Sequence, residues 1–418
     1  MKKSIFFLAA LLTLSFAACS GNDPEPAATD TAAQSGGSGD PGTLTPTDSG
    51  EGWEYYAFRN RLVISMDTIP DVVREDLTPW YQYRNNITEI LFSRNVVYIG
   101  DYAFRGCKVN DLHLPSALKV IGSYAFADCP NLGTVTIQST VTKIGEYAFS
   151  KSKISYLYFN AQMKTIPTNA FRDCTGLEKI NISSGVETIM YNAFRGCTSL
   201  TTLYLPSTLK AIYDYAFADC SSLTSLDIRS SSIIYEFAFR NCTSLTTINI
   251  TNALLSTGNF MGCTALKEAT INSSTSKNQY LPDSLFCGCS SLETISGISY
   301  VKCVQNYTFY GCSALKSFSF PALTEIRNYA FAYCTGLEDV YLPSTVSSIG
   351  VGAFYSCSNL AKIRSANPTP PYLGSSAFTK TDSGRFLYVK DATAKSAYAA
   401  STSWSKFFTS SMIKDYLY

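Results

Sequence analysis

Asp101-Tyr-Ala-Phe-Arg-Gly-Cys107 recurs with small changes as Ser123-Tyr-Ala-Phe-Ala-Asp-Cys129 and as Asp214-Tyr-Ala-Phe-Ala-Asp-Cys220. The phenylalanine in the middle of this stretch returns every 21 to 26 residues, at Phe104, Phe126, Phe149, Phe171, Phe194, Phe217, Phe239, Phe260, Phe286, Phe309, Phe331, Phe354 and Phe378. A unit of about 23 residues cannot bury its apolar side alone, so it has to stack on its neighbours. The thirteen copies therefore predict a repeat solenoid.

Each unit has the same internal order: the anchor phenylalanine, a cysteine three residues later, a leucine three residues after that, and then an alternating segment. Thr202-Leu-Tyr-Leu-Pro206 is one such segment, and its period of two indicates a strand with one buried side. We therefore expect a right-handed coil of about 13 turns, each contributing one short parallel strand, with a length of about 60 Å at 4.8 Å between paired strands.

The Ala-Phe-x-x-Cys-x-x-Leu unit resembles that of the BspA-like leucine-rich-repeat proteins, which are cell-surface lipoproteins of host-associated anaerobes. The resemblance covers residues 53–418 and implies a leucine-rich-repeat solenoid over residues 99–379. It also implies caps at both ends, because an uncovered terminal turn would expose apolar surface and free strand edges. Trp53 and Trp80 resemble parts of an N-terminal cap, residues 53–98, and Trp404 resembles part of a C-terminal cap, residues 380–418.

The first residues have the pattern of a signal peptide, expected over residues 1–18: Lys2 and Lys3 precede an apolar run and the small residues Ala17 and Ala18. Ser15-Phe-Ala-Ala-Cys19 resembles the lipobox of bacterial lipoproteins, which implies lipidation of Cys19. Ordinary cleavage beside an incidental cysteine is the alternative. The remainder of residues 19–52 is rich in Pro, Gly, Ser and Thr, which indicates a flexible linker.

The short stretch Asn22-Asp-Pro-Glu25 resembles an acidic tag that directs some Gram-negative lipoproteins to the outer face. We therefore expect a lipid-anchored protein of the outer membrane that faces the cell exterior, with an orientation into the periplasm as the alternative. No stretch after the signal peptide approaches the 18 consecutive apolar residues of a membrane span. The expected membrane contact is therefore the N-terminal lipid only.

Charge and motifs argue against several other classes of protein. The balance of 33 Lys and Arg against 32 Asp and Glu gives no field that would attract nucleic acid. The sequence has no phosphate loop, nucleotide fingerprint or calcium loop, and its only histidine, His113, is expected to point outward from a strand. We therefore expect no catalytic residues, no cofactor and no nucleic-acid partner.

The cysteines that follow the anchor phenylalanines occupy one repeated position, which predicts packing residues rather than a redox or metal series. Cys287 and Cys303 lie outside this set. A zinc site at Cys287, Cys289 and Cys303 would need four convergent ligands, so we expect no metal. Unpaired thiols are the favoured interpretation of Cys287 and Cys303, and a disulfide between them is the alternative.

The outward positions of the predicted strands should line up from turn to turn into a ribbon, which is the usual ligand surface of leucine-rich repeats. The candidate ligand-binding residues are His113, Tyr156, Tyr158, Asn181, Tyr204, Asp227, Asn249, Tyr341 and Arg364. Tyrosines among small polar residues are typical of recognition surfaces, and Tyr156, Tyr158 and Tyr204 are the densest group. The alternative is that these are ordinary solvated strand positions.

Two functions fit this reading. The first is a cell-surface binding or adhesion protein that recognises a host extracellular-matrix or cell-surface protein, or another cell, through the outward ribbon. The second is a glycan-capturing surface lipoprotein that serves nutrient uptake and would need aromatic platforms for sugar rings. A hydrolase carried on the solenoid is a weak third reading, because no large insertion interrupts the repeats.

Overall fold

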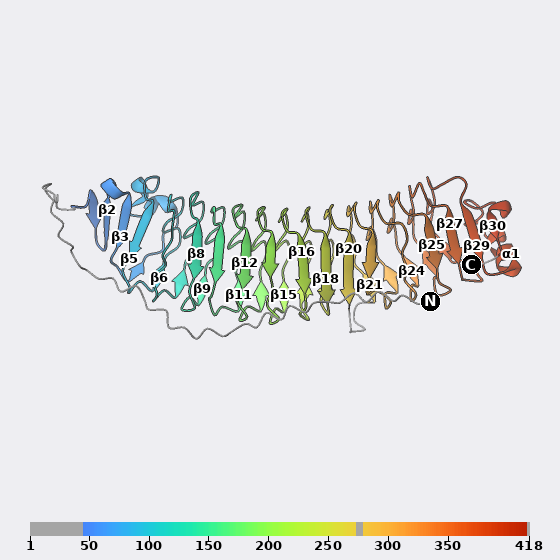
Figure 1. Ribbon diagram of the computed structural model, residues 1–418, viewed down its shortest axis with the longest axis horizontal. Helices are drawn as coiled ribbons and strands as arrows, with labels where there is room; N and C mark the ends of the chain where they lie inside the picture. The colour runs from blue at the N-terminus through green and yellow to red at the C-terminus, as the bar shows by residue number, and fades with distance from the viewer. Residues whose placement is uncertain (1–44, 273–278, 416–418) are drawn as a thin grey trace, which may run out of the picture. The chain divides into compact units, whose positions relative to one another are not determined.

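A computed structural model describes residues 45–272 and 279–415. The predicted signal peptide and Cys19 lie outside these residues. The described chain winds into about 14 turns of parallel-strand solenoid with little helix (Figure 1). Successive turns stack along one axis, and the strands of neighbouring turns pair into several sheets along that axis. The predicted leucine-rich-repeat solenoid is therefore confirmed.

The longer strands form parallel sheets on one side of the solenoid. The first of these sheets contains β8 (Thr134–Ile137), β10 (Tyr156–Phe159), β12 (Lys179–Ile182) and β14 (Thr202–Tyr204). The second contains β16 (Ser225–Ile228), β18 (Thr247–Thr251), β20 (Glu268–Asn272) and β22 (Thr294–Ser296). The third contains β25 (Asp339–Leu342), β27 (Lys362–Ser365), β29 (Phe386–Val389) and β30 (Ile413–Lys414). We call the outward side of these strands the strand face.

Most turns carry a second, two-residue strand, which corrects the prediction of one strand per turn. These strands also pair in parallel, in three sheets. They are β4 (Thr68–Ile69), β6 (Tyr98–Ile99), β7 (Val120–Ile121), β9 (Lys143–Ile144), β11 (Thr165–Ile166), β13 (Thr188–Ile189), β15 (Ala211–Ile212), β17 (Ile233–Ile234), β19 (Leu254–Leu255), β21 (Tyr280–Leu281), β23 (Cys303–Val304), β24 (Glu325–Ile326), β26 (Ser348–Ile349) and β28 (Tyr372–Leu373). Two residues cannot show a period of two, so the sequence pattern revealed only a buried aliphatic residue.

The anchor phenylalanines form the axis of the core. Each is buried, and each ring stacks on the next at centroid distances of 5.1 to 5.8 Å. Trp80 continues this stack at the N-terminal end, 5.4 Å from Phe104. Trp404 lies 5.9 Å from Phe378 at the other end. The repeat spacing in the sequence thus becomes one continuous column of aromatic rings.

The repeated cysteines lie beside this column and connect successive turns. The Cys220 thiol donates a hydrogen bond to the carbonyl oxygen of Phe194, the anchor of the preceding turn, at 3.3 Å. Ser152 replaces the cysteine in one turn, and its hydroxyl donates to the Phe126 carbonyl oxygen at 2.5 Å. Burial raises the pKa of the Cys129 thiol to about 12 and also raises that of the Cys220 thiol, so both stay protonated donors. The repeated cysteines are therefore packing residues.

The backbone reverses direction around each anchor through two left-handed residues. Tyr102 and Tyr124 have φ of 60° and 56° two residues before their anchors, and Gly106 and Asp128 have φ of 73° and 57° two residues after them. Glycine, asparagine and aspartate tolerate this conformation best, which explains their frequency after the anchor. The tyrosines before the anchor stack on one another instead: Tyr102 and Tyr124 lie 4.8 Å apart. The repeated tyrosine is therefore a packing ladder.

The N-terminal end of the solenoid is covered by a different topology. β1 (Asp48–Gly50), β2 (Trp53–Tyr56) and β3 (Arg61–Ile64) pair antiparallel, and β3 then pairs in parallel with β5 (Glu89–Phe92). Three 3-10 turns accompany them: η1 (Ala57–Arg59), η2 (Glu75–Leu77) and η3 (Tyr81–Tyr83). β1 lies inside residues 19–52, where the sequence predicted linker. Its three residues include no apolar side chain, so no hydrophobic alternation marks the strand in the sequence.

The C-terminal end is closed by the chain's only α-helix within the described residues, α1 (Ala392–Ala400), followed by η4 (Ser410–Met412) and β30. Asp391 caps the helix, because its carboxylate accepts a hydrogen bond from the Ala394 amide at 2.8 Å. Tyr398 of α1 and Trp404, which lies between α1 and η4, are buried. The last turn of the solenoid is thus covered by apolar side chains of the segment that follows it.

Candidate ligand-binding face

The strand face owes its exposed side chains to the alternation within each strand. On β10, Leu157 and Phe159 are buried, whereas Tyr156 and Tyr158 point outward with 44% and 56% of their surface exposed. On β14, Tyr204 is 63% exposed. The predicted outward direction of these three tyrosines is therefore what the structure shows.

The register of the first sheet aligns the central candidates. Tyr158 is paired with Thr136 on one side and Asn181 on the other, and Asn181 is paired in turn with Tyr204. The four residues therefore form one outward column across β8, β10, β12 and β14. His113 is also exposed, but its turn contributes only a single bridge, Leu112 to Val135, instead of a strand.

The second sheet brings two more candidates together. Asp227 and Asn249 are paired in register on β16 and β18, and the Asn249 side-chain amide donates to Asp227 Oδ1 at 3.3 Å. Arg229 was not among the predicted residues, yet its guanidinium lies 2.7 Å from the Asp227 carboxylate. Arg229 lies one residue beyond the end of β16 and two residues after Asp227, so the alternation of the strand predicts that it points outward too. Asn249 is half-buried, so Asp227 and Arg229 are the more accessible groups.

The third sheet combines an ion pair with an aromatic ring. Tyr341 and Arg364 are paired in register on β25 and β27. The Arg364 guanidinium lies 2.9 Å from the Asp339 carboxylate and 5.8 Å from the centroid of the Tyr341 ring. Asp339 belongs to the neighbouring outward position of β25, so the candidate set missed it although the alternation marks it as outward.

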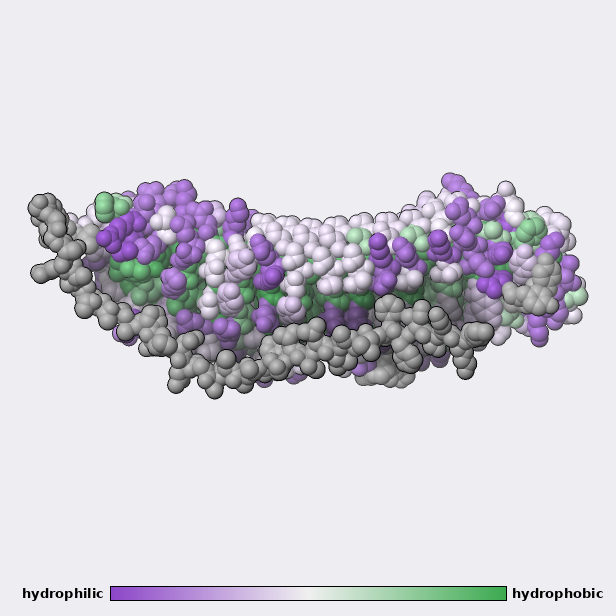
Figure 2. Space-filling view, in the orientation of Figure 1, coloured by the Kyte–Doolittle hydropathy of each residue, from purple (hydrophilic) through white to green (hydrophobic). Residues whose placement is uncertain are grey.

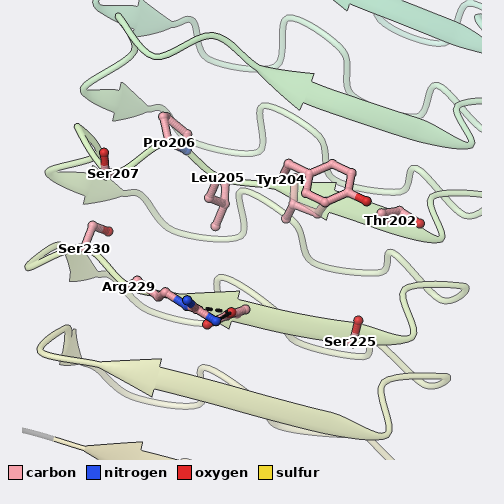
Figure 3. A pocket seen from close by; sticks show the side chains of 10 residues that line it. Thr202, Tyr204, Leu205, Pro206, Ser207, Ser225, Arg229 and Ser230 are labelled. Atoms are coloured by element: carbon pink, nitrogen blue, oxygen red, sulfur yellow. Dashed lines mark hydrogen bonds and ion pairs between the residues drawn. The ribbon is translucent and has the colours of Figure 1, made fainter. Parts of the chain in front are cut away.

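The strand face is interrupted twice, where the sequence predicted one continuous ribbon. β14 and β16 belong to different sheets, as do β22 and β25. A hollow of about 410 Å³ lies at the first interruption, lined by Tyr204, Asp227 and Arg229 among others (Figure 3). A larger hollow of about 710 Å³ lies at the second, lined by Tyr341, Arg364 and Asp339 among others. The candidates thus fall into three groups.

Proline accompanies the shortened strands. Pro206 has no N–H to donate to the preceding turn, and β14 ends at Tyr204, one residue earlier than β12 ends in register. Pro115 and Pro321 follow the two turns in which the long strand is absent from the described residues. Pro206 and Pro321 accompany the two interruptions of the strand face, whereas Pro115 precedes β8 and Pro343 follows the full-length β25.

The polarity of the face is graded along the solenoid. Figure 2 shows side chains of intermediate hydropathy along the middle of this side and strongly hydrophilic ones toward both ends.

The Tyr156 hydroxyl donates to Glu178 at 3.3 Å, and the charge of that carboxylate raises the pKa of Tyr156. The tyrosine is therefore a neutral hydrogen-bonding group at any physiological pH.

Within the described part of the chain, the possible metal ligands form no metal site and the cysteines outside the repeated position form no disulfide. Residues 45–272 and 279–415 contain no group of three or more His, Cys, Asp or Glu side chains that could hold a metal ion. Cys287 and Cys303 are half-buried free thiols. The Cys303 thiol donates to Glu325 at 3.5 Å, and burial, with a smaller contribution from Glu325, raises its pKa to about 11.

Comparison with known proteins tests the resemblance seen in the repeats. The BspA type leucine rich repeat region matches six copies, over residues 53–178, 164–281 and 279–401. This chain belongs to the BspA-type leucine-rich-repeat family. Members of this family are surface proteins, and a leucine-rich-repeat solenoid typically binds and does not catalyse, so the family fits a binding role. A search of curated proteins found no match.

The solenoid of this BspA-type protein is shared with solved bacterial structures. A leucine-rich repeat protein from Bacteroides ovatus is 23% identical with a TM-score of 0.60, covering 75% of this chain and 92% of its own. One from Eubacterium ventriosum is 23% identical with a TM-score of 0.40, covering 66% and 90%. A leucine rich cell surface protein from Faecalibacterium prausnitzii is 19% identical with a TM-score of 0.37, covering 87% and 97%. The first of these supports the fold.

None of the helices in the described residues of this BspA-type protein has the length and apolar character that crossing a membrane requires.

Proposed function

We propose that this BspA-type protein is a surface binding or adhesion protein that recognises a host extracellular protein or another cell through its strand face. The observation that carries the proposal is the register of Tyr158, Asn181 and Tyr204, which lines up exposed aromatic and amide groups on one side of a rigid sheet. Rigid tyrosines supply large contact areas at low entropic cost. Many modest contacts along such a face add up to useful affinity.

The proposed location follows from the N-terminal residues. We propose that residues 1–18 are removed, that Cys19 is lipidated, and that the lipid anchors the protein in the outer membrane of a Gram-negative bacterium, facing the exterior. Lys2 and Lys3 before an apolar run and the Ala17-Ala18-Cys19 sequence support this proposal. Several acyl chains on one residue anchor stably where one chain does not.

We propose that the protein works without catalysis, cofactor or nucleic-acid partner. The near balance of basic and acidic residues supports this proposal. The exposed candidates support it too, because they are tyrosines, amides and charged groups that already pair with one another, as on a recognition surface. Its partner is therefore expected to be a protein or glycan at a cell surface.

The test is binding of the purified protein to immobilised fibronectin, laminin, collagen and fibrinogen and to whole host cells. A variant with Tyr156, Tyr158 and Tyr204 all changed to Ala should lose that binding. A matched control, Tyr372→Ala, removes an equally exposed tyrosine, at 66%, from the two-residue strand β28. Binding that survives the triple change, or that falls only in Tyr372→Ala, would contradict the proposal.

A further inference from the structure

The two interruptions of the strand face share a set of side chains. At the first, the hollow between β14 and β16 is lined by the exposed ring of Tyr204 and by the Asp227–Arg229 ion pair. At the second, the hollow between β22 and β25 is lined by the ring of Tyr341 and by the Asp339–Arg364 ion pair. Each of these two hollows thus combines an exposed tyrosine with an arginine–aspartate pair.

The first hollow is a slot between two strand edges. Figure 3 shows Tyr204 and Thr202 on one strand, Ser225 on the next strand and Arg229 just beyond the end of that next strand, all bordering the same space. Ser207 and Ser230 also line it, together with the apolar side chains of Leu203, Leu205 and Pro206. Its volume of about 410 Å³ lies within the usual range of small-ligand sites, about 300–1,000 Å³. The slot therefore offers one flat aromatic ring and apolar surface, with several hydrogen-bonding groups at its border.

Charge decides which ligand fits this slot. The Arg229 guanidinium lies 2.7 Å from the Asp227 carboxylate, so each charge is already neutralised by the other. An anionic ligand would have to displace Asp227 from Arg229, and a cationic ligand would have to displace Arg229 from Asp227. A neutral ligand rich in hydroxyls displaces neither, because the carboxylate keeps lone pairs to accept O–H groups and the guanidinium keeps N–H groups to donate.

The second hollow is larger and also combines a tyrosine ring with a neutralised ion pair. Asp339 lies 2.9 Å from Arg364, which also lies over the Tyr341 ring at 5.8 Å and braces it. Tyr341 is 38% exposed, so part of its ring stays open to a ligand. Lys316, Ser317 and Glu338 add further donors and acceptors around about 710 Å³. This hollow accommodates a larger portion of a ligand than the first.

We propose that the two hollows are subsites for neutral saccharide rings of one extended glycan chain, with Tyr204 and Tyr341 as stacking platforms. A sugar ring presents a flat C–H face to an aromatic ring and hydroxyls at its edge, which matches the tyrosine and the ion pair. The two platforms lie six turns apart, about 29 Å at 4.8 Å per turn. The inference rests on the proposed function, because it assigns a ligand class to part of the same strand face.

The experiment uses affinity gel electrophoresis and surface binding of the full secreted protein with amylopectin, xylan, mannan and dextran, and an array of neutral mammalian glycans. At least one neutral glycan should bind, and its polymer should bind about a hundredfold more tightly than its monosaccharide because two subsites are engaged. Tyr204→Ala and Tyr341→Ala should each weaken binding about tenfold, and the double variant should abolish it.

Matched variants separate this inference from a loss of folding. Tyr204→Phe keeps the ring and should retain glycan binding, and Tyr372→Ala should bind as the unchanged protein does. No binding to any neutral glycan, binding only to sialylated or sulfated glycans, or binding insensitive to both tyrosine changes would overturn the inference. If protein or cell binding through the strand face survives such a result, only the saccharide assignment fails. If that binding is absent too, the proposed function fails with it.

Discussion

Truncation of a central anchor, Phe217→Ala, should destabilise the solenoid strongly. The Phe217 side chain is fully buried and stacks on Phe194 and Phe239 at centroid distances of 5.2 and 5.4 Å. Removing a buried phenylalanine costs about 3–5 kcal/mol of unfolding free energy. Two aromatic pairs are lost here, each contributing about 0.5–1.5 kcal/mol beyond burial, which places the cost near the upper end, about 5 kcal/mol.

The assay is urea unfolding followed by circular dichroism, with Tyr204→Ala as the matched control from the preceding strand. Tyr204 is 63% exposed, so its removal should change the unfolding free energy by about 0.5 kcal/mol or less. Because each turn contacts only its neighbours, Phe217→Ala should also separate unfolding into two transitions, one for each side of the weakened turn. A loss of stability in Phe217→Ala no larger than in Tyr204→Ala would refute the stacked-anchor reasoning.

Three further outcomes follow from the same contacts. Cys220→Ser should lower the free energy of unfolding by only about 1 kcal/mol, because Ser152 makes the equivalent hydrogen bond in its own turn. Cys220→Lys buries a charge and should lower it by about 4 kcal/mol or more. Thermal melts that cannot distinguish the two variants would contradict this. The Cys303 thiol has a pKa of about 11 and is neutral below it, so its labelling by iodoacetamide should rise with pH up to about 11; fast labelling at pH 7 would contradict the burial. Cys19→Ser should move the protein from the membrane fraction to the soluble fraction of the expressing bacterium, and continued membrane association would count against lipidation.

The periodic part of the structure could be predicted from the sequence because stacking imposes the same environment on every turn. Phe217 and its equivalents mark the core, and the alternation around Tyr158 assigns buried and exposed sides correctly. Cys220 could be placed inward for the same reason. A residue type that recurs at a fixed spacing occupies the same environment in every turn. Its recurrence in the sequence therefore predicts whether that position is buried.

The departures from periodicity could not be predicted because they depend on pairing between neighbouring turns. β14 ends early at Tyr204 and leaves a sheet break before β16, yet Pro343 follows a strand of full length. A proline therefore weakens the ladder without deciding where it breaks. Arg229 became a candidate only once its contact with Asp227 was known, since ion pairs between outward positions are invisible in a hydrophobic pattern.

The most direct test of recognition through the strand face is hydroxyl-radical footprinting of the protein with its bound target, a matrix protein or a glycan, because this method reports the exposure of individual tyrosines. A bound matrix protein should protect Tyr156, Tyr158 and Tyr204, and a bound glycan should protect Tyr204 and Tyr341. Either target should leave Tyr280 and Tyr372, on the two-residue strands, as reactive as in the free protein. Protection of Tyr280 and Tyr372 with an unchanged strand face would contradict the account.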